Sequence, residues 1–172
     1  FLHGSGDRGN DVAHLQDLKP FQLKLPAIVA APQCLPSCSW EPEAVARFIE
    51  YLASRYRVDR DRIYLVGYSM GGYGTWRTAA AYPEVFAAIV PICGGGEPEN
   101  ASKLAGIPVW AFHGVEDKVV PVAQTERMVG ALRSAGGQPL LTILPHAGHG
   151  ICDDVCDRAD LWKWLFEQHR SR

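Results

Sequence analysis

The stretch 67–71 (GYSMG) has residue types that suit nucleophilic chemistry. It directly follows the apolar run 63–66 and precedes a run of helix formers that ends at Pro83. A G-x-S-x-G pattern between a strand and a helix is typical of a nucleophile elbow, a sharp turn that exposes the serine hydroxyl. The flanking glycines leave room for the chain to pass close to itself. The pattern makes Ser69 a candidate nucleophile; the competing interpretation is an ordinary loop in which Ser69 only caps the helix.

Two further residues that suit this chemistry stand in loops directly after apolar runs. Asp117 follows the run 108–114, and His149 lies between two glycines after the run 140–144. In a parallel sheet the functional loops lie outside the carboxyl ends of the strands. We therefore expect Ser69, Asp117 and His149 to meet at one edge of the sheet, and this convergence favours the elbow over the ordinary loop.

The glycine-rich loop 3–11 also follows the end of a strand-like run. It lacks the Lys-Ser/Thr of a phosphate-binding P-loop, so that interpretation is discarded. In the elbow interpretation, a backbone N–H of Ser5 points at the site beside Ser69. His3 in the same loop is expected to be a structural hydrogen-bonding residue and not a catalytic base.

The elements that must position these loops alternate along the chain. Periodicity and turn residues predict five strands and four helices, with a short helix or ordered loop at 11–18. The strands are expected at 27–31, 63–66, 86–93, 108–114 and 140–144, and the helices at 43–57, 75–82, 121–135 and 160–169. Such alternation predicts an α/β fold with a mostly parallel sheet flanked by helices.

The size and composition fit one globular domain that spans residues 1–172. A formal net charge of −2 and the absence of Lys/Arg runs argue against a nucleic-acid surface. No apolar stretch is long enough to span a bilayer, so no membrane partner is expected. The chain begins without Met or a signal peptide, which suggests a fragment or a processed chain. The localisation therefore cannot be read from targeting signals.

Five cysteines are an odd number, so at least one is unpaired within the chain. Cys93 lies in an apolar run and is expected to be a buried small hydrophobe. The other four form two C-x-x-x-C pairs, Cys34/Cys38 and Cys152/Cys156. Disulfides of undetermined connectivity would suit an extracellular or periplasmic protein, and a four-cysteine metal site is the less favoured alternative.

Several motifs together resemble the α/β-hydrolases, within them the esterase and phospholipase/carboxylesterase-like group often labelled predicted peptidases. Feruloyl-esterase-like and polyhydroxyalkanoate depolymerase-like enzymes are similar neighbours. The resemblance covers nearly the whole chain. It rests on residues 1–11 (FLHGSGDRGND), 31–34 (APQC), 61–76 (DRIYLVGYSMGGYGTW), 91–96 (PICGGG), 110–121 (WAFHGVEDKVVP) and 148–150 (GHG).

The resemblance implies a triad of Ser69, Asp117 and His149, in the chain order Ser, Asp, His of this fold. It also implies an oxyanion hole made by the backbone N–H groups of Met70 and Ser5, and no cofactor. This sequence departs from the family by lacking the strands that normally precede the one ending at Leu2. The N-terminal strands of the fold are therefore expected to be truncated.

The expected function is hydrolysis of short-chain or small acyl esters through an acyl-enzyme, with a small-molecule ester as partner and the oligomeric state left open. A serine peptidase of the same fold, or an inactive fragment that acts as a binding domain, are the alternatives. Trp40 and Tyr68 are candidates to line the substrate cleft, although Trp40 could equally pack under a loop. The rivals within the triad are His146 for the base, and Glu116, Asp153 and Asp154 for the acid.

Overall fold

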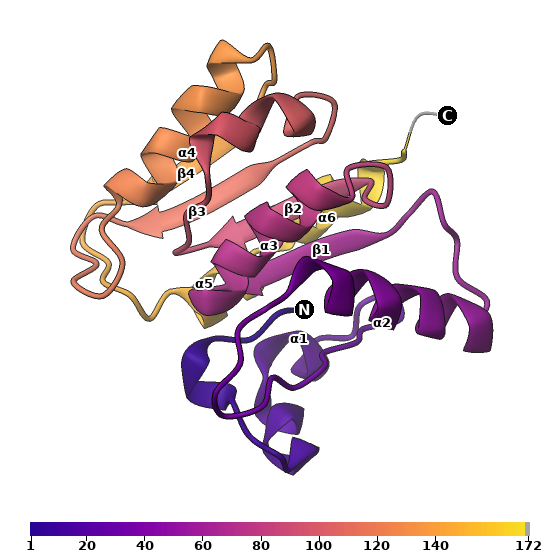
Figure 1. Ribbon diagram of the computed structural model, residues 1–172. Helices are drawn as coiled ribbons and strands as arrows, with labels where there is room; N and C mark the ends of the chain where they lie inside the picture. The colour runs from indigo at the N-terminus through magenta and orange to yellow at the C-terminus, as the bar shows by residue number, and fades with distance from the viewer. Residues whose placement is uncertain (171–172) are drawn as a thin grey trace.

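A computed structural model describes residues 1–170, and its centre is a parallel sheet of four strands (Figure 1). The strands lie in the order β1 (Tyr64–Tyr68), β2 (Ala88–Ile92), β3 (Trp110–Gly114) and β4 (Leu140–Leu144). All three neighbouring pairs are parallel. Parallel neighbours need crossover connections, and helices make these connections here. The predicted α/β class with a mostly parallel sheet flanked by helices is confirmed.

Helices cover both faces of the sheet. In Figure 1, α3 lies on one face over β1 and β2, and α6 lies on the other. The α-helices are α1 (Lys19–Gln22), α2 (Pro42–Arg55), α3 (Met70–Ala81), α4 (Ala123–Ser134), α5 (Cys152–Cys156) and α6 (Ala159–Glu167), with 3-10 segments at Ser5–Asp7, Val12–Asp17 and Pro98–Leu104. No described helix is both long and apolar enough to cross a bilayer.

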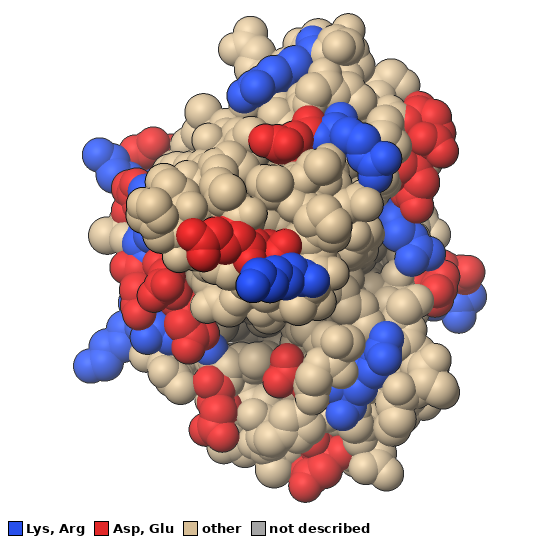
Figure 2. All heavy atoms as spheres, turned by 90° about the vertical axis from the view of Figure 1, so that its left-hand side faces the viewer, with Lys and Arg blue, Asp and Glu red and all other residues tan. Residues whose placement is uncertain are grey.

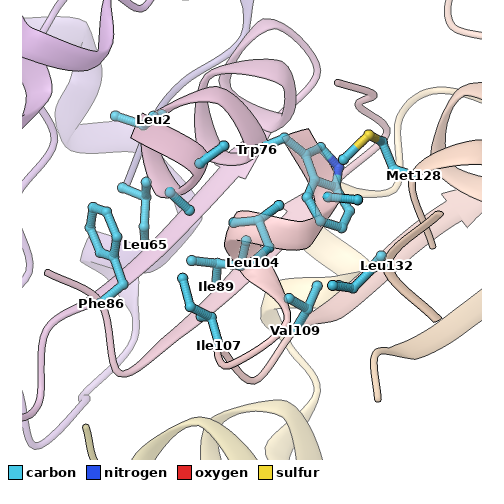
Figure 3. Packing of buried hydrophobic residues seen from close by; sticks show 14 of the residues in the cluster. Leu2, Leu65, Trp76, Phe86, Ile89, Leu104, Ile107, Val109, Met128 and Leu132 are labelled. Carbon is cyan, nitrogen blue, oxygen red and sulfur yellow. The ribbon is translucent and has the colours of Figure 1, made fainter. Parts of the chain in front are cut away.

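Each face of the sheet has its own hydrophobic core, because side chains alternate along a strand. Leu65, Ile89 and Ala111 point into a core shared with α2, α3 and α4, where Trp76 is almost fully buried (Figure 3). Neighbouring residues such as Val66 and Phe112 point the opposite way, into a core built with α5 and α6. Burial on both faces holds the carboxyl ends of the strands in fixed positions.

The strand predicted at 27–31 is wrong. None of these residues belongs to a strand, and the segment is bonded instead to the Phe1 amino group, which donates to the Ala30 carbonyl at 2.6 Å. An apolar run becomes a strand only where a neighbouring strand offers a row of hydrogen bonds. Among residues 1–170, pairing on the side of β1 that faces this segment is limited to a single bridge between Leu2 and Gly67.

The turn from β1 into α3 is the tightest passage in the fold. Ser69 has φ 55° and ψ −115°, which puts a non-glycine residue in a strained region. A Cβ on Gly71 would lie 1.9 Å from the carbonyl oxygen of Leu2, and one on Gly67 would lie 2.2 Å from the carbonyl oxygen of Gly71. The two glycines of the predicted elbow are therefore required by close backbone contacts, not by loop flexibility.

Replacing Gly71 with Ala is expected to destabilise the fold by about 2–3 kcal/mol, because backbone atoms cannot move aside as a flexible side chain can. Gly130→Ala is the matched control, since Gly130 also lies in a helix but no atom lies within 4 Å of its added Cβ. That change is expected to stabilise by about 0.5–1 kcal/mol through backbone entropy alone. Urea unfolding of both variants makes the comparison; equal midpoints would contradict this account of the turn.

Candidate active site

The loops that carry Ser69, Asp117 and His149 meet at the carboxyl edge of the sheet. Ser69 follows β1, Asp117 lies three residues after β3, and His149 lies five residues after β4. Figure 2 looks onto this edge and shows acidic and basic side chains interspersed around a hollow, not a field of one sign. The expected convergence of the three residues is what the structure shows.

The three side chains form a continuous hydrogen-bonded chain. His149 Nε2 lies 2.8 Å from Ser69 Oγ, and His149 Nδ1 lies 2.7 Å from Asp117 Oδ2. A carboxylate can only accept, so Nδ1 carries a proton, and in the neutral ring Nε2 then faces the hydroxyl as an acceptor. This is the tautomer in which the imidazole can remove the proton from Ser69.

The Asp117 carboxylate is buried but well supplied with donors. Its Oδ1 accepts from the backbone N–H groups of Val119 and Val120, both at 2.8 Å. Burial alone would raise the pKa of Asp117, but the hydrogen bonds from His149, Val120 and Val119 together outweigh it and hold the pKa below its usual range. The group is therefore ionised when it faces a neutral His149.

Hydrogen bonds hold the backbone of His149 as well as its ring. The hydroxyl of Tyr68 donates to the carbonyl oxygen of His149 at 2.9 Å, and the N–H of Ile151 donates to the same oxygen at 2.9 Å. The rings of Tyr68 and His149 lie 5.2 Å apart. Tyr68, which sequence reasoning placed at the substrate cleft, therefore anchors the loop that carries His149.

Close backbone contact also seats this loop against β3. A Cβ on Gly114 would lie 2.2 Å from the carbonyl oxygen of Ala147. The N–H of Glu116 donates to that same carbonyl at 2.9 Å. Gly114 thus lets the loop with His149 pack directly onto the loop with Asp117, which sets the distance between the two side chains.

The oxyanion hole that the resemblance implies would be made by the backbone N–H groups of Met70, which directly follows Ser69, and of Ser5. Each is the first residue of a helical turn, where the N–H has no intrahelical acceptor. A Cβ on Gly4 would lie 3.7 Å from the Cβ of Ser69, so the loop before Ser5 is in contact with the elbow. The arrangement is compatible with the oxyanion hole that the resemblance implies, which stays a prediction.

Trp40 does not line an open cleft, and this expectation is corrected. Its side chain is 5 % exposed and belongs to the core, where Nε1 donates to the His3 carbonyl oxygen at 3.0 Å. His3 is the structural residue that was predicted. It is buried, its Nε2 accepts from the Cys34 N–H at 3.0 Å, and its Nδ1 lies 2.6 Å from the Gly4 carbonyl. Both residues shape the loop that carries Ser5.

The rivals for the triad roles point elsewhere. The side chain of His146 is 93 % exposed and faces Glu116 at 3.8 Å. Asp153 and Asp154 are exposed in the first turn of α5. In the part of the chain that the structure describes, the hydrogen-bond partner of the Ser69 hydroxyl is His149 and none of these residues. The geometry favours His149 and Asp117 over all of them.

All five cysteines are free thiols, so neither the expected disulfides nor a four-cysteine cluster is present in the described residues. One set with the spacing of a metal site does occur there, because ligand atoms of Cys93, His113 and Asp117 lie within 4.8 Å of one another. Two of the three groups are already engaged: Asp117 accepts hydrogen bonds on both oxygens, and His113 has partners at both ring nitrogens. The set does not fit a cation.

His113 is a residue that sequence reasoning missed. It is fully buried at the end of β3, and its Nε2 lies 3.2 Å from Asp117 Oδ2. The available signal was a histidine inside an otherwise apolar run that ends two residues before the acidic loop. That signal says only that the side chain needs partners, because nothing local reveals which ones it finds.

An apolar groove of about 540 Å³ lies away from this site. It is bounded by the segment 25–30, α2, β1 and α6, and its lining excludes Ser69, Asp117 and His149. A hydrophobic cavity is the usual first choice for a ligand site, but chemistry needs the reactive groups in reach. We therefore place the candidate active site at the carboxyl edge of the sheet and not in this groove.

The lowered pKa of Asp117 makes a prediction for stability. A carboxyl with a depressed folded pKa stabilises the fold above its unfolded pKa of about 3.9, and this contribution is lost as the pH falls through the folded value. The difference in unfolding free energy between the native chain and Asp117→Asn should therefore shrink between about pH 5 and about pH 2.5. Urea titrations across that range measure it; a constant or growing difference would contradict the assignment.

Comparisons with known proteins show the family to which the chain belongs. The sequence profile of the Dienelactone hydrolase family matches residues 37–160. A putative carboxymethylenebutenolidase of Salmonella typhimurium is 31% identical over 111 residues, which cover 59% of this chain and 41% of that protein. The bifunctional acetylxylan esterase/xylanase XynS20E of Neocallimastix patriciarum is 34% identical over 83 residues, 48% of this chain and 12% of that protein.

Among solved structures, a thermostable esterase superposes with a TM-score of 0.88 at 36% identity, covering 99% of this chain and 54% of its own. SOBER1 F65L of Arabidopsis thaliana, at 18% identity and a TM-score of 0.73, covers 95% of each chain and shares the fold. The chain spans less than half the length of the two curated relatives named above. With the profile match over 124 of its 172 residues, the chain belongs to the Dienelactone hydrolase family of α/β-hydrolases.

Proposed function

We propose that this chain is a serine hydrolase of carboxylic esters. The observation that carries the proposal is the hydrogen-bonded chain from Asp117 through His149 to Ser69. Three supports are independent of one another: the strained turn that presents the serine, the tautomer of the histidine, and the family to which the chain belongs.

In the proposed reaction, Ser69 Oγ attacks the ester carbonyl carbon while His149 Nε2 takes the hydroxyl proton. The carbonyl electron pair moves onto the oxygen, which the N–H groups of Met70 and Ser5 stabilise. Each such donor lowers the barrier by about 3 kcal/mol in comparable sites. His149 then returns its proton to the departing alkoxide, and the acyl group stays on Ser69.

A water molecule completes the cycle. His149 removes one proton from the water, the resulting hydroxide adds to the acyl carbon, and Ser69 leaves with the proton that His149 returns. Asp117 stays ionised throughout and balances the imidazolium that forms twice in each turnover. Every proton that leaves a nucleophile in this scheme is returned to a leaving group.

We further propose short or small acyl groups as substrates. Figure 2 shows an open hollow at the carboxyl edge, and the apolar groove of about 540 Å³ is not lined by the triad residues. A relative is named for acetylxylan ester hydrolysis, and this name is consistent with a small acyl group in that protein. Turnover of peptide amides but not of esters would instead indicate a peptidase. Turnover of neither would indicate an inactive binding domain.

Replacing Ser69 with Ala is expected to lower kcat on p-nitrophenyl acetate by a factor of about 10⁴ or more, because no nucleophile remains. Ser54→Ala is the matched control, since that serine is exposed in α2 and bonds only to the Tyr51 carbonyl. It should retain full activity. Hydrolysis by a folded Ser69→Ala chain at the native rate would refute the proposal.

Replacing Tyr68 with Phe is expected to lower kcat by a factor of about 3 to 10 with little change in KM, because the loop with His149 loses one anchoring hydrogen bond. Tyr64→Phe removes an equivalent bond from a tyrosine hydroxyl to the Gln168 carbonyl, remote from the site. It should reduce stability by about 1 kcal/mol and leave kcat intact. Steady-state kinetics on both variants separates the two effects, and equal kcat losses would contradict the role of Tyr68.

A further inference from the structure

His113 is a fully buried histidine with hydrogen-bond partners at both ring nitrogens. Its Nδ1 lies 2.7 Å from the hydroxyl oxygen of Thr125 in α4. Its Nε2 lies 2.9 Å from the carbonyl oxygen of Val120 and 3.2 Å from Asp117 Oδ2. The proposed reaction does not use this residue, so its placement needs its own explanation.

The partners of Nε2 fix one proton. A carbonyl oxygen and a carboxylate oxygen are both acceptors, and neither can supply a hydrogen. If Nε2 were unprotonated, its lone pair would face two further lone pairs at 2.9 and 3.2 Å in a site without exposed surface. Such an arrangement is costly in a buried site. Nε2 therefore carries a proton.

The partner of Nδ1 fixes the second proton. The Thr125 hydroxyl has a single hydrogen, and its oxygen lies 2.6 Å from the carbonyl oxygen of Gly94. That carbonyl can only accept, so Thr125 donates to Gly94 and has only lone pairs left for His113. The short contact between Nδ1 and the Thr125 oxygen then requires a hydrogen on Nδ1.

We propose that His113 is held as a doubly protonated imidazolium and acts as a positioning residue for Asp117. In this state both ring N–H groups have an acceptor, the Val120 carbonyl for Nε2 and the Thr125 hydroxyl for Nδ1. The positive charge lies against the Asp117 oxygen that also accepts from His149, while the Val119 and Val120 amides hold the other oxygen. Both carboxylate oxygens are thus held, which opposes rotation of the group away from His149.

The proposal rests on the proposed function only in its effect on activity. An imidazolium beside Asp117 offsets part of the negative charge that His149 feels when it takes a proton. His113 therefore opposes the gain of a positive charge by His149, while the hydrogen bonds from His149, Val120 and Val119 hold the pKa of Asp117 low. The resting state then has a buried ion pair next to a neutral base.

The groups that face His113 come from three other segments. Asp117 lies in the loop after β3, and the thiol of Cys93 lies just after β2, within the same 4.8 Å cluster. Burial raises the pKa of the Cys93 thiol to about 12, so this group is neutral. Helix α4 presents the neutral Thr125 hydroxyl, and His149 lies across Asp117. The one described negative charge in contact with the ring is Asp117.

The protonation state can be read without any enzyme assay. Nitrogen-15 NMR of the histidine rings distinguishes protonated from bare nitrogens, and His113 is identified by comparison with His113→Gln. We expect both His113 nitrogens to be protonated at neutral pH, in the native chain and equally in Ser69→Ala, because both face acceptors. A single protonated nitrogen on His113 under these conditions would overturn the proposal. Failure of the ester hydrolase proposal would leave this readout untouched.

The effect on activity is measured from kcat/KM against pH. In His113→Gln the charge is lost, so His149 holds its proton more tightly and the acidic limb of the profile moves up by about one pH unit. His146→Gln, an exposed histidine near the site, is the matched control and should not move the limb. A lower plateau without a shift would mean that His113 is merely structural and would overturn the proposal.

Thr125→Val covers the case in which His113→Gln does not fold. Valine has nearly the shape of threonine but offers no acceptor to Nδ1. The NMR spectrum of the variant is therefore expected to show one proton fewer on His113. The acidic limb of its kcat/KM profile is expected to move upward, as in His113→Gln. If the His113 ring stays doubly protonated in Thr125→Val and the acidic limb of the kcat/KM profile does not move, Thr125 does not hold the second proton. That result would overturn the assignment of this hydrogen bond.

Discussion

The Asp117 carboxylate is the group on which the arrangement of the site depends. It lies in the interior, where an unpaired charge would cost several kcal/mol, and it is stabilised because donors reach both of its oxygens. These donors come from its own loop and from the loop after β4. A single buried charge therefore fixes two loops relative to each other, and with them the ring that faces Ser69.

The other constraint is close backbone contact at two glycines, one in the elbow and one at the end of β3. Gly71 lies against the Leu2 carbonyl and Gly114 against the Ala147 carbonyl, so that loops from three strands approach within distances that no other residue permits. The two cores on the faces of the sheet hold the strand ends rigidly enough for these contacts to persist. Precision at the site is thus a property of packed strands and glycine contacts, more than of the loops themselves.

Periodicity predicted much of the fold. The last strand, 140–144, has the bounds of β4, and the helix expected at 43–57 is α2 with its ends shifted by one or two residues. Ser69, Asp117 and His149 could be found because each follows a strong apolar run, and such runs end at one edge of a parallel sheet. Local pattern and tertiary structure agree at these places.

The failures have a common physical cause. The run 27–31 is as apolar as a strand, but whether a neighbour pairs with it is not a local property. Trp40 in a loop gave no sign of whether it faces solvent or core. His113 depends on Thr125 and Gly94, which the fold brings from α4 and from the end of β2. Partners that are distant in sequence are invisible to spacing arguments.

Reaction with a fluorophosphonate tests the central claim most directly, because the reagent modifies a serine only where a base has activated it. The account predicts one phosphonyl adduct per chain, mapped by peptide mass spectrometry to Ser69 and absent from a folded His149→Gln variant. An unmodified native chain, or an adduct on Ser69 that forms equally fast without His149, would contradict it.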